Sequence, residues 1–411
     1  MSRPENIRRV LLVLTSQCNL RCGYCFQNDK KPGRMESKTM LRAIDLAFES
    51  KQREVDLTFF GGEPLLELEL LRLGIDYAEK RRQETGKHVT YSISTNGLLL
   101  SDEVVELLAQ YHFYTQLSFD GVPDMQRLRG ASTFSALDRR LHEIGERWPK
   151  FLRECLHIGM TLVPSTVSHF ADSIEYFLGR GVCEIGVNPS MSVMMDWELG
   201  RIEELEEQFA RILELSVAHY TATEEIPLKV FRGGPTRSLA RPESISMCGV
   251  MRGDEPAVDV DGQVHGCATF AKSFQRFPSS FLRERIEDMS IGDLHAPEFP
   301  HRYRQFAKAT ERAGIFHRKE EKHSGYGRCG DCRYLAACSI CPMSIGNLPG
   351  NQDPQRVPDF SCAYNLVALK HRDLFWERID DEEPFAVFSR EIPNKLGRFQ
   401  NSTVNAVGDR E

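Results

Sequence analysis

Three cysteines stand close together near the start of the chain, in the segment CNLRCGYCF. Cys18, Cys22 and Cys25 are spaced C-x3-C-x2-C and follow directly after the apolar run from Val10 to Leu14. A tetrahedral zinc site needs four protein ligands, and disulfides need cysteines in pairs. A 4Fe-4S cluster has four irons, so three thiolates would leave one iron open to another ligand. The spacing therefore favours an iron–sulfur cluster with one free coordination position.

A second group of cysteines lies in the last third of the chain, which has 12 cysteines in all. In a reducing compartment, clustered cysteines are more often metal ligands than disulfides. Zinc binding is the plain alternative, because C-x2-C pairs suit it. The seven cysteines of this second group are Cys248, Cys267, Cys329, Cys332, Cys338, Cys341 and Cys362.

Length and charge limit the classes of protein to consider. The 411 residues are enough for two domains, and the formal charge is −7, from 59 acidic and 52 basic side chains. This mild acidity gives no sign of a basic surface that would bind a nucleic-acid backbone. The N-terminus does not resemble a signal peptide, and no apolar stretch approaches the roughly 20 residues that cross a bilayer. We expect a cytoplasmic protein without nucleic-acid or membrane partners.

The first half of the chain alternates strand-like and helix-like segments. Such alternation predicts an α/β fold with a parallel sheet and right-handed crossovers. Six units are too few for a closed eight-stranded barrel, so we expect a partial (β/α)6 barrel of the TIM type or an open sheet. The expected strands are RRVLLVLTS, VDLTFF, VTYSIST, TQLSFD, LHIGMTLV and CEIGVNP. The expected helices cover residues 37–50, 66–83, 101–112, 135–148, 168–180 and 198–219, with Ser37 and Ser101 as N-caps.

Polar and glycine-rich turns follow these strands, where parallel α/β folds place their chemistry. FFGGEP ends the second strand, STNG the third and SFDG the fourth. Glycine lets a backbone approach a ligand closely, and a carboxylate can pair with an ammonium group. A turn-forming Asp-Gly pair is the structural alternative for SFDG.

The amino-acid composition of the sequence changes near residue 231. Glycine and proline increase, and AVDVDGQVHGCATF reads as a β-hairpin that turns at Asp261-Gly262. The last residues are charged and polar. We therefore divide the chain into a barrel (1–230), a cysteine-rich domain (231–375) and a charged tail (376–411).

The cysteine loop after the first strand of a β-α array resembles the radical S-adenosylmethionine (SAM) superfamily. The resemblance implies a 4Fe-4S cluster whose open iron binds SAM, and a 5′-deoxyadenosyl radical that abstracts a hydrogen atom. It implies that Tyr24 lies against the adenine and that the GGEP turn holds the SAM amino group. Asp120 would bind the ribose or act as a base towards the substrate. The implied cofactor-binding residues are Tyr24, Gly61, Gly62, Glu63, Pro64, Thr95, Asn96, Ser118 and Asn188.

The C-terminal cysteines resemble the SPASM domain of peptide and protein maturases. They follow C-x13-G-x4-C, then C-x2-C-x5-C-x2-C, then a last cysteine, where the family pattern has x3 in place of the final x2. The resemblance implies two auxiliary 4Fe-4S clusters, and hence three clusters in the chain. The distal auxiliary cluster would be bound by Cys329, Cys332, Cys338 and Cys362, and the one nearer the barrel by Cys248, Cys267 and Cys341.

The nearer auxiliary cluster would then lack a fourth cysteine. In CGVMRGDEP, Asp254 and Glu255 are the only anionic candidates. Carboxylate oxygen is a harder ligand than thiolate and suits this iron less well. We expect an open iron there, or a fourth position filled by Asp254 or an exogenous donor.

The resemblance implies a radical SAM oxidoreductase that oxidises or crosslinks a ribosomally made peptide or a protein, with a flavodoxin or ferredoxin as electron donor. Dehydrogenation of a small metabolite is one alternative, and a metal-binding regulatory module without turnover is another. Sulfatase-maturing members have an Asp directly after the second SPASM cysteine. Here Ala268 stands in that place, which disfavours formylglycine formation.

About nine residues precede the first expected strand. A winged-helix leader-binding domain needs on the order of 80 residues. We therefore expect a leader peptide to be bound by a separate protein or by the barrel and SPASM surfaces.

Overall fold

The first half of the chain folds as a row of six parallel strands. The computed structural model describes residues 6–27, 32–190, 201–239, 253–271, 289–308, 318–346 and 350–379. Within these ranges the strands form a nine-stranded sheet in the order β6-β5-β4-β3-β2-β1-β7-β8-β9 and a separate two-stranded sheet. The partial (β/α)6 barrel predicted from the alternating pattern is confirmed. Its strands are β1 (Arg9–Thr15), β2 (Glu54–Gly61), β3 (His88–Thr95), β4 (Tyr114–Ser118), β5 (Leu156–Leu162) and β6 (Ile185–Pro189).

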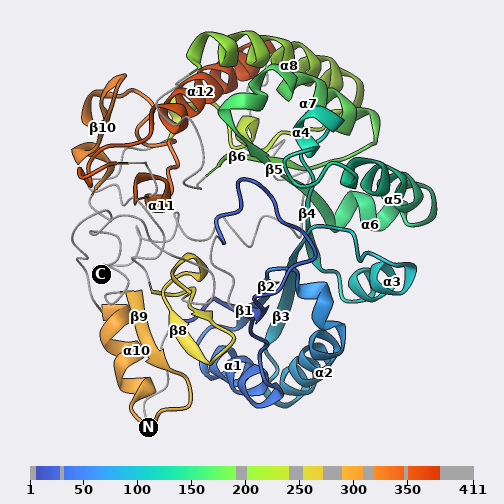
Figure 1. Cartoon of the computed structure of the whole chain (residues 1–411), viewed down its shortest axis with the longest axis vertical. Helices are drawn as coiled ribbons and strands as arrows, with labels where there is room; N and C mark the ends of the chain where they lie inside the picture. The colour runs from blue at the N-terminus through green and yellow to red at the C-terminus, as the bar shows by residue number, and fades with distance from the viewer. Residues whose placement is uncertain are drawn as a thin grey trace, which may run out of the picture.

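Helices cover the outer face of this curved sheet (Figure 1). In α1, Met40, Ile44 and Phe48 lie on one face and are buried. The Ser101 side chain caps α3 by accepting a hydrogen bond from the Val104 amide, as predicted. The main helices are α1 (Ser37–Glu49), α2 (Leu68–Thr85), α3 (Asp102–Gln110), α5 (Thr133–Arg147), α7 (Phe170–Gly179) and α8 (Ile202–Thr223), with α4 (Pro123–Gln126) and α6 (Pro149–Glu154) as short turns.

One expected cap is wrong by a residue. Ser37 is the first helical residue of α1, and the N-cap position belongs to Glu36, whose side chain makes no capping hydrogen bond. Helix ends commonly shift by a residue or two when read from a pattern.

The alternation of β1 divides its side chains between two environments. Val10, Leu12 and Leu14 are buried in the main core between the sheet and the helices. Val13 points to the other face, where it packs with Ala271 in a small cluster. Successive side chains of a strand face opposite sides, so β1 links the outer core to the barrel interior.

The predicted hairpin is confirmed and continues the barrel sheet. β7 (Ala257–Val258) pairs antiparallel with β8 (Gln263–His265), and Gly262 in the turn has a positive φ of 83°. β7 also pairs in parallel with β1, and β8 pairs with β9 (Ser290–Asp293), which precedes α10 (Phe299–Lys308). A strand of two residues has no periodicity to detect, so this extension of the sheet could not be read from the sequence.

The rest of the cysteine-rich region lies across the open side of the barrel (Figure 1). It contains β10 (His323–Ser324), β11 (Gly327–Arg328), α11 (Pro342–Gly346) and the long α12 (Asp359–Ile379). α12 packs along α8, and the Tyr364 hydroxyl donates to the Val187 carbonyl oxygen of β6 at 3.2 Å. The predicted boundary at residue 375 falls inside this helix, and most of the expected tail, 380–411, lies outside the described residues. None of the described helices has the length and apolar character needed to cross a membrane.

Candidate active site

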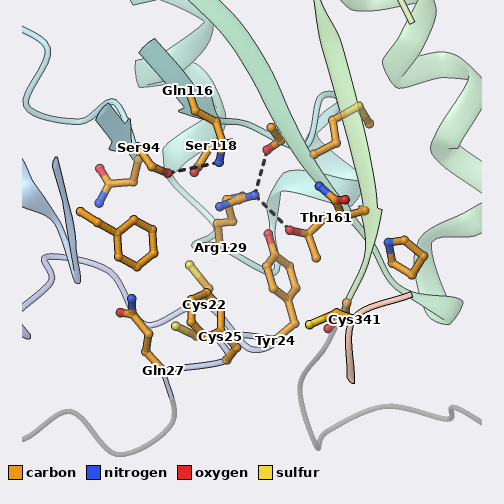
Figure 2. Close-up of a pocket in the computed structure, with 18 of the residues that line it drawn as sticks. Cys22, Tyr24, Cys25, Gln27, Ser94, Gln116, Ser118, Arg129, Thr161 and Cys341 are labelled. Atoms are coloured by element: carbon orange, nitrogen blue, oxygen red, sulfur yellow. Dashed lines mark hydrogen bonds between the residues drawn. The ribbon is translucent and has the colours of Figure 1, made fainter. Parts of the chain in front are cut away.

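One cavity of about 440 Å³ lies over the carboxyl ends of the barrel strands. This volume falls within the range of small-molecule sites. The cavity brings together the cysteine loop, the ends of β2 to β6, residues 339–344 and the first turns of α12 (Figure 2). Among the predicted site residues, those that line it are Cys18, Cys22, Tyr24, Cys25, Gly61, Gly62, Thr95, Asn96, Ser118, Asn188 and Cys341.

The cysteine loop presents its three thiols to this cavity. Cys18, Cys22 and Cys25 are free and partly exposed. The Leu20 amide and the Asn96 side-chain amide point at the Cys18 sulfur, at 3.4 and 3.7 Å. Burial raises the pKa of the Cys22 thiol to about 11, so a bare thiolate is unfavourable there and a bound metal would favour it. Three soft donors facing one cavity fit a cluster with an open iron.

The two glycines after β2 are required by the approach of the cysteine loop. The Gly62 amide donates to the Thr15 carbonyl oxygen, and the Glu63 amide to that of Gln17, both at 2.8 Å. A Cβ atom on Gly62 would lie 2.1 Å from the Gln17 carbonyl oxygen, and one on Gly61 would lie 2.4 Å from that of Thr15. From the sequence we expected these glycines to let the backbone approach a ligand closely. In the structure they let it approach residues Thr15 to Gln17, which lead into the cysteine loop.

A Gly62→Ala variant should therefore lose stability. The added methyl group must displace backbone, and overpacking of this kind costs about 1–3 kcal/mol or more. Gly179→Ala is the matched control, because a Cβ atom there meets nothing within 4 Å. We expect that control to be neutral or stabilising by up to about 1 kcal/mol. Chemical unfolding of both full-length variants measures the difference, and equal midpoints would contradict the steric account.

Glu63 does not reach the cavity, contrary to its expected contact with the SAM amino group. Its side chain is fully buried and accepts hydrogen bonds from the Thr95 hydroxyl and the Asn96 amide, both at 2.7 Å, and from the Leu65 amide at 3.1 Å. Burial raises its pKa to about 7, against the effect of these bonds. The carboxyl group therefore holds the turn that ends β3, while Pro64 begins a 3₁₀ turn behind the cavity wall.

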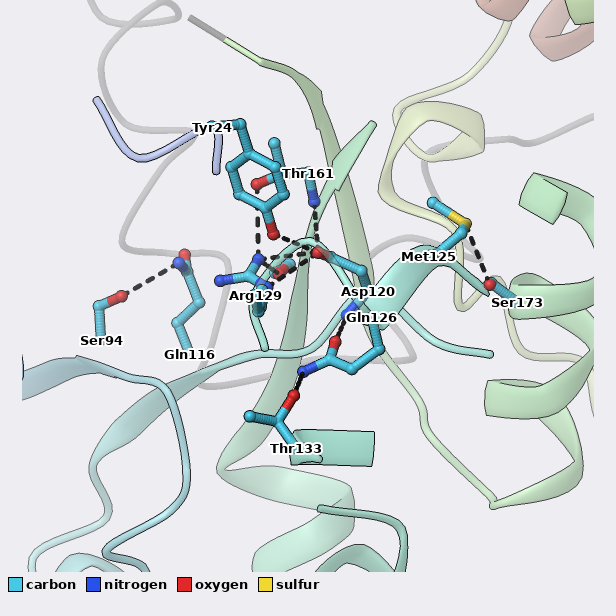
Figure 3. A network of polar contacts seen from close by, with 11 residues as sticks. Tyr24, Ser94, Gln116, Asp120, Met125, Gln126, Arg129, Thr133, Thr161 and Ser173 are labelled. Carbon is cyan, nitrogen blue, oxygen red and sulfur yellow. Dashed lines mark hydrogen bonds and ion pairs between the residues drawn. The ribbon is translucent and has the colours of Figure 1, made fainter. Parts of the chain in front are cut away.

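Asp120 is committed to a buried ion pair and does not fit the base that we predicted. Arg129 donates to both of its carboxylate oxygens, at 2.8 and 2.9 Å, and the Thr161 amide donates to one of them at 2.9 Å (Figure 3). The Tyr24 hydroxyl donates to the same carboxylate. Asp120 is fully buried and is absent from the cavity lining. A carboxylate with these partners positions its neighbours and has little capacity to accept a substrate proton.

Tyr24 enters the cavity wall through this network. The Arg129 guanidinium lies over the Tyr24 ring, 5.4 Å from its centroid, and burial is the main cause that raises the pKa of the tyrosine. Gly23 is also tied to the short helix that precedes Arg129, since its amide donates to the Leu128 carbonyl oxygen at 2.8 Å. The contacts fix the aromatic ring at the cavity wall, which is compatible with the predicted place against an adenine.

Sequence reasoning missed Arg129 and the polar side chains of β3 and β4. Arg129 is the only Lys, Arg or His among the described lining residues. Gln116 donates to the Ser94 hydroxyl at 3.2 Å on the same wall. Arg129 follows no strand directly, so the rule that looks at strand ends could not find it. Gln116 lies inside a strand, where its polarity at an inward position was the available signal.

The four cysteines predicted for the distal auxiliary cluster form one electrostatic group. Cys338 interacts with Cys329, Cys332 and Cys362, and Cys329 interacts with Cys332 and Cys362. Burial raises the pKa of Cys338 to about 12 and that of Cys329 to about 11. Four partly buried thiols gathered in this way fit a metal cluster better than free cysteines, because a bound metal removes the cost of the charge.

The cysteines predicted for the nearer cluster are only partly described. Cys267 and Cys341 pack against the same small hydrophobic cluster, and Cys341 also lines the cavity. Cys248 lies outside the described residues.

Asp254 lies at the end of the barrel opposite the cysteine loop. Its carbonyl oxygen accepts from the Arg8 and Arg9 amides at the start of β1, the end opposite the cysteine loop. Its carboxylate lies 3.9 Å from Arg8, and that of Glu255 lies 3.5 Å from Arg9. A strand of seven residues spans roughly 23 Å, so both carboxylates belong to the far end of the barrel.

Within the described residues, no three His, Cys, Asp or Glu side chains form a group that could hold a single metal ion. In a four-iron cluster each thiolate binds a different iron, so this finding bears only on single-ion sites such as zinc.

Known proteins resemble the chain in sequence over part of its length and in fold over most of it. The Radical SAM superfamily model matches residues 12–177. A cysteine-type anaerobic sulfatase-maturating enzyme of Clostridium perfringens is 26% identical over 181 residues, covering 40% of this chain and 46% of that protein. The radical SAM cyclopropyl synthase TigE of Paramaledivibacter caminithermalis is 27% identical over 210 residues, covering 45% and 43%. The matched segments span less than half the length of these relatives.

Two solved structures share the fold over most of the chain. The anaerobic sulfatase-maturating enzyme anSMEcpe with bound AdoMet superposes with a TM-score of 0.69 at 16% identity, covering 93% of this chain and 98% of that one. SuiB of Streptococcus suis bound to its precursor peptide SuiA superposes with a TM-score of 0.54 at 13% identity, covering 88% and 76%. Residues 12–177, which contain the three thiols, the double-glycine turn and the buried Arg–Asp pair around one cavity, match the radical SAM superfamily, and the chain shares its fold with these two solved structures.

Proposed function

We propose that this chain is a radical SAM enzyme that oxidises or crosslinks a peptide or protein substrate. The observation that carries the proposal is the single cavity that Cys18, Cys22 and Cys25 share with Arg129 and Cys341. When bound, a 4Fe-4S cluster and SAM supply an electron and a carbon-centred radical for hydrogen abstraction. The peptide substrate is supported by the fold shared with SuiB, a protein whose structure was solved with its precursor peptide SuiA bound.

The chain's own residues would bind and orient the cofactors. Cys18, Cys22 and Cys25 would hold the cluster, and Gly61 and Gly62 would let the loop close over it. Arg129 offers a guanidinium at the cavity wall for an anionic group such as a carboxylate. Its guanidinium is paired with the Asp120 carboxylate, which fixes its direction.

Formylglycine formation stays disfavoured, although sulfatase-maturating enzymes are among the relatives. Ala268 is buried at the start of a turn after Cys267. No Asp, Glu or His occurs among the described residues that line the cavity. A reaction that needs a protein base close to the substrate would have to draw it from another part of the chain.

For the nearer auxiliary cluster we propose three cysteine ligands, Cys248, Cys267 and Cys341, with a fourth position that is open or filled by an exogenous donor. The position of Cys341 in the cavity wall supports a site close to the substrate. A fourth cysteine sulfur bonded to that cluster in an anaerobic crystal structure would contradict this assignment.

Binding of SAM to the reconstituted chain tests the proposal. We expect SAM to change the electron paramagnetic resonance (EPR) spectrum of the reduced protein, because it fills the open iron held by the three-cysteine loop. Arg129→Lys should weaken SAM binding about tenfold or more, since lysine lacks the planar two-donor geometry. An unchanged spectrum with SAM present would contradict the proposed cofactor site.

The substrate class needs a separate measurement. Peptides encoded beside the gene, incubated with the reduced enzyme and SAM, should lose two hydrogen masses when an oxidation or crosslink forms. Modification of a sugar alcohol, with unmodified peptides, would favour the small-metabolite alternative.

A further inference from the structure

Two lysines, one buried and one partly buried, lie beside the four thiols of the distal group. Lys322 is 1% exposed, and Lys319 is partly buried on the same short segment. The Lys322 carbonyl oxygen accepts a hydrogen bond from the Cys329 amide at 2.9 Å. The Lys319 ammonium donates to the carbonyl oxygen of Cys338, itself one of the four. Both lysines interact electrostatically with Cys329.

The direct partners of both ammonium groups in the described part of the chain are backbone carbonyls. Lys319 donates to Leu335 at 3.3 Å as well as to Cys338, and Lys322 donates to Pro354 at 2.9 Å. Glu320, Glu321 and Asp353 act on them only through longer-range attraction. Burying a cation without a carboxylate beside it is costly unless another anion is near. The anion that this site offers is the group of four thiolates.

We propose that Lys319 and Lys322 raise the reduction potential of the distal auxiliary cluster, a step that rests on the proposed function because it assumes that the cluster is present. A 4Fe-4S cluster with four thiolate ligands carries net negative charge, and reduction adds more. Buried cations stabilise the reduced form more than the oxidised form, and net charge is a recognised control of these potentials. The cluster thereby becomes a better electron acceptor.

A hydrogen bond to sulfur acts in the same direction. The Ser324 hydroxyl donates to the Cys362 sulfur at 3.1 Å and is buried. Hydrogen bonds to cluster sulfurs raise the potential, as added positive charge does. Lys319, Lys322 and Ser324 are therefore three donors on the same short segment that act on the same group of four thiols.

The test is a redox titration of the full reconstituted chain followed by EPR. The distal signal is the one lost in Cys338→Ser. Lys322→Met keeps the buried aliphatic volume but removes the charge, and we expect its reduction equilibrium constant to fall at least tenfold, which is 59 mV towards more negative potential for a one-electron couple. Lys319→Met should shift it in the same direction, and Lys322→Arg should restore most of the wild-type value.

Arg333→Gln is the matched control. Arg333 follows Cys332 directly but its side chain is 75% exposed, so solvent screens the charge and the potential should barely move. If the role of the lysines were purely structural, their substitution would change the amount of cluster bound, but the reduction potential would not depend on the charge of the side chain. If Lys322→Met does not assemble the cluster, Lys319→Met decides. Potentials unchanged in the lysine variants, or shifted equally in Arg333→Gln, would overturn the proposal.

Failure of this inference is distinguishable from failure of the proposed function. Formation of 5′-deoxyadenosine by the wild-type chain depends on the three-cysteine loop and reports on the proposed function. The potential of the distal cluster reports on the lysines alone. If the wild-type chain cleaves SAM but the lysine variants keep its distal-cluster potential, only the role of the lysines is refuted.

Discussion

Cys22→Ala is expected to abolish SAM cleavage. Cys18, Cys22 and Cys25 are the three thiols of one loop that line the cavity, so a cluster held by three ligands has no spare donor there. The yield of 5′-deoxyadenosine after reduction should fall to the background level. Iron content should fall from about 12 to about 8 atoms per chain, because the auxiliary clusters use other cysteines.

The control for this variant is Cys155→Ala. Cys155 is buried in the main hydrophobic core and is not among the residues that line the cavity, so SAM cleavage and iron content should persist. A Cys22→Ala protein that still forms 5′-deoxyadenosine would refute the assignment of the loop. A loss of all iron would instead show that the clusters assemble only together.

Asp120→Asn is expected to destabilise the barrel by about 3–5 kcal/mol, the usual cost of breaking a buried ion pair from one side. The substitution leaves the buried Arg129 guanidinium without its carboxylate. It also weakens the bond from Tyr24, which ties the cysteine loop to the end of β4 (Figure 3). The midpoint of chemical unfolding of the full chain measures the loss, and SAM affinity should fall with it.

Asp172→Asn is the matched control. Asp172 pairs with Arg211 at 2.7 Å, but both side chains are more than two-fifths exposed. Exposed pairs contribute about 0–1 kcal/mol, so this variant should unfold almost as the wild type does. A catalytic base would behave differently. If Asp120→Asn kept its stability and its SAM cleavage but lost product formation, Asp120 would be a base after all and the positioning role would fail.

The elements were predictable because their signals are local and repeated. Each of the six strands has an apolar run that ends in a polar or glycine turn, and such runs are specific when they alternate with amphipathic helices. The ends of parallel strands meet at one edge, which explains why Cys18, Gly62, Asn96 and Ser118 share a cavity.

The roles of side chains within the site were harder to predict. Glu63 and Asp120 follow strands, as ligand-binding residues often do. Both carboxylates, however, face inwards and accept hydrogen bonds from other residues of the same chain. A sequence shows that a carboxylate is near the site but does not show which hydrogen-bond donors the fold brings to it. Arg129, the partner of Asp120, is nine residues further on and gives no periodic signal.

The pairing of β7 with β1 was not predictable for a related reason. The two residues of β7 pair with β1 across more than 240 positions of sequence, and contacts of such long range leave no local pattern. The same pairing explains why Asp254 lies at the far end of the barrel, although its spacing from Cys248 suggested a ligand.

The most direct test of the central claim is the formation of 5′-deoxyadenosine by the wild-type chain. The protein should be purified without oxygen, reconstituted with iron and sulfide, reduced with dithionite and supplied with SAM. The account predicts 5′-deoxyadenosine in amounts that depend on the reductant, together with acid-labile sulfide that matches the iron. A protein that contains zinc alone and forms no 5′-deoxyadenosine would contradict it.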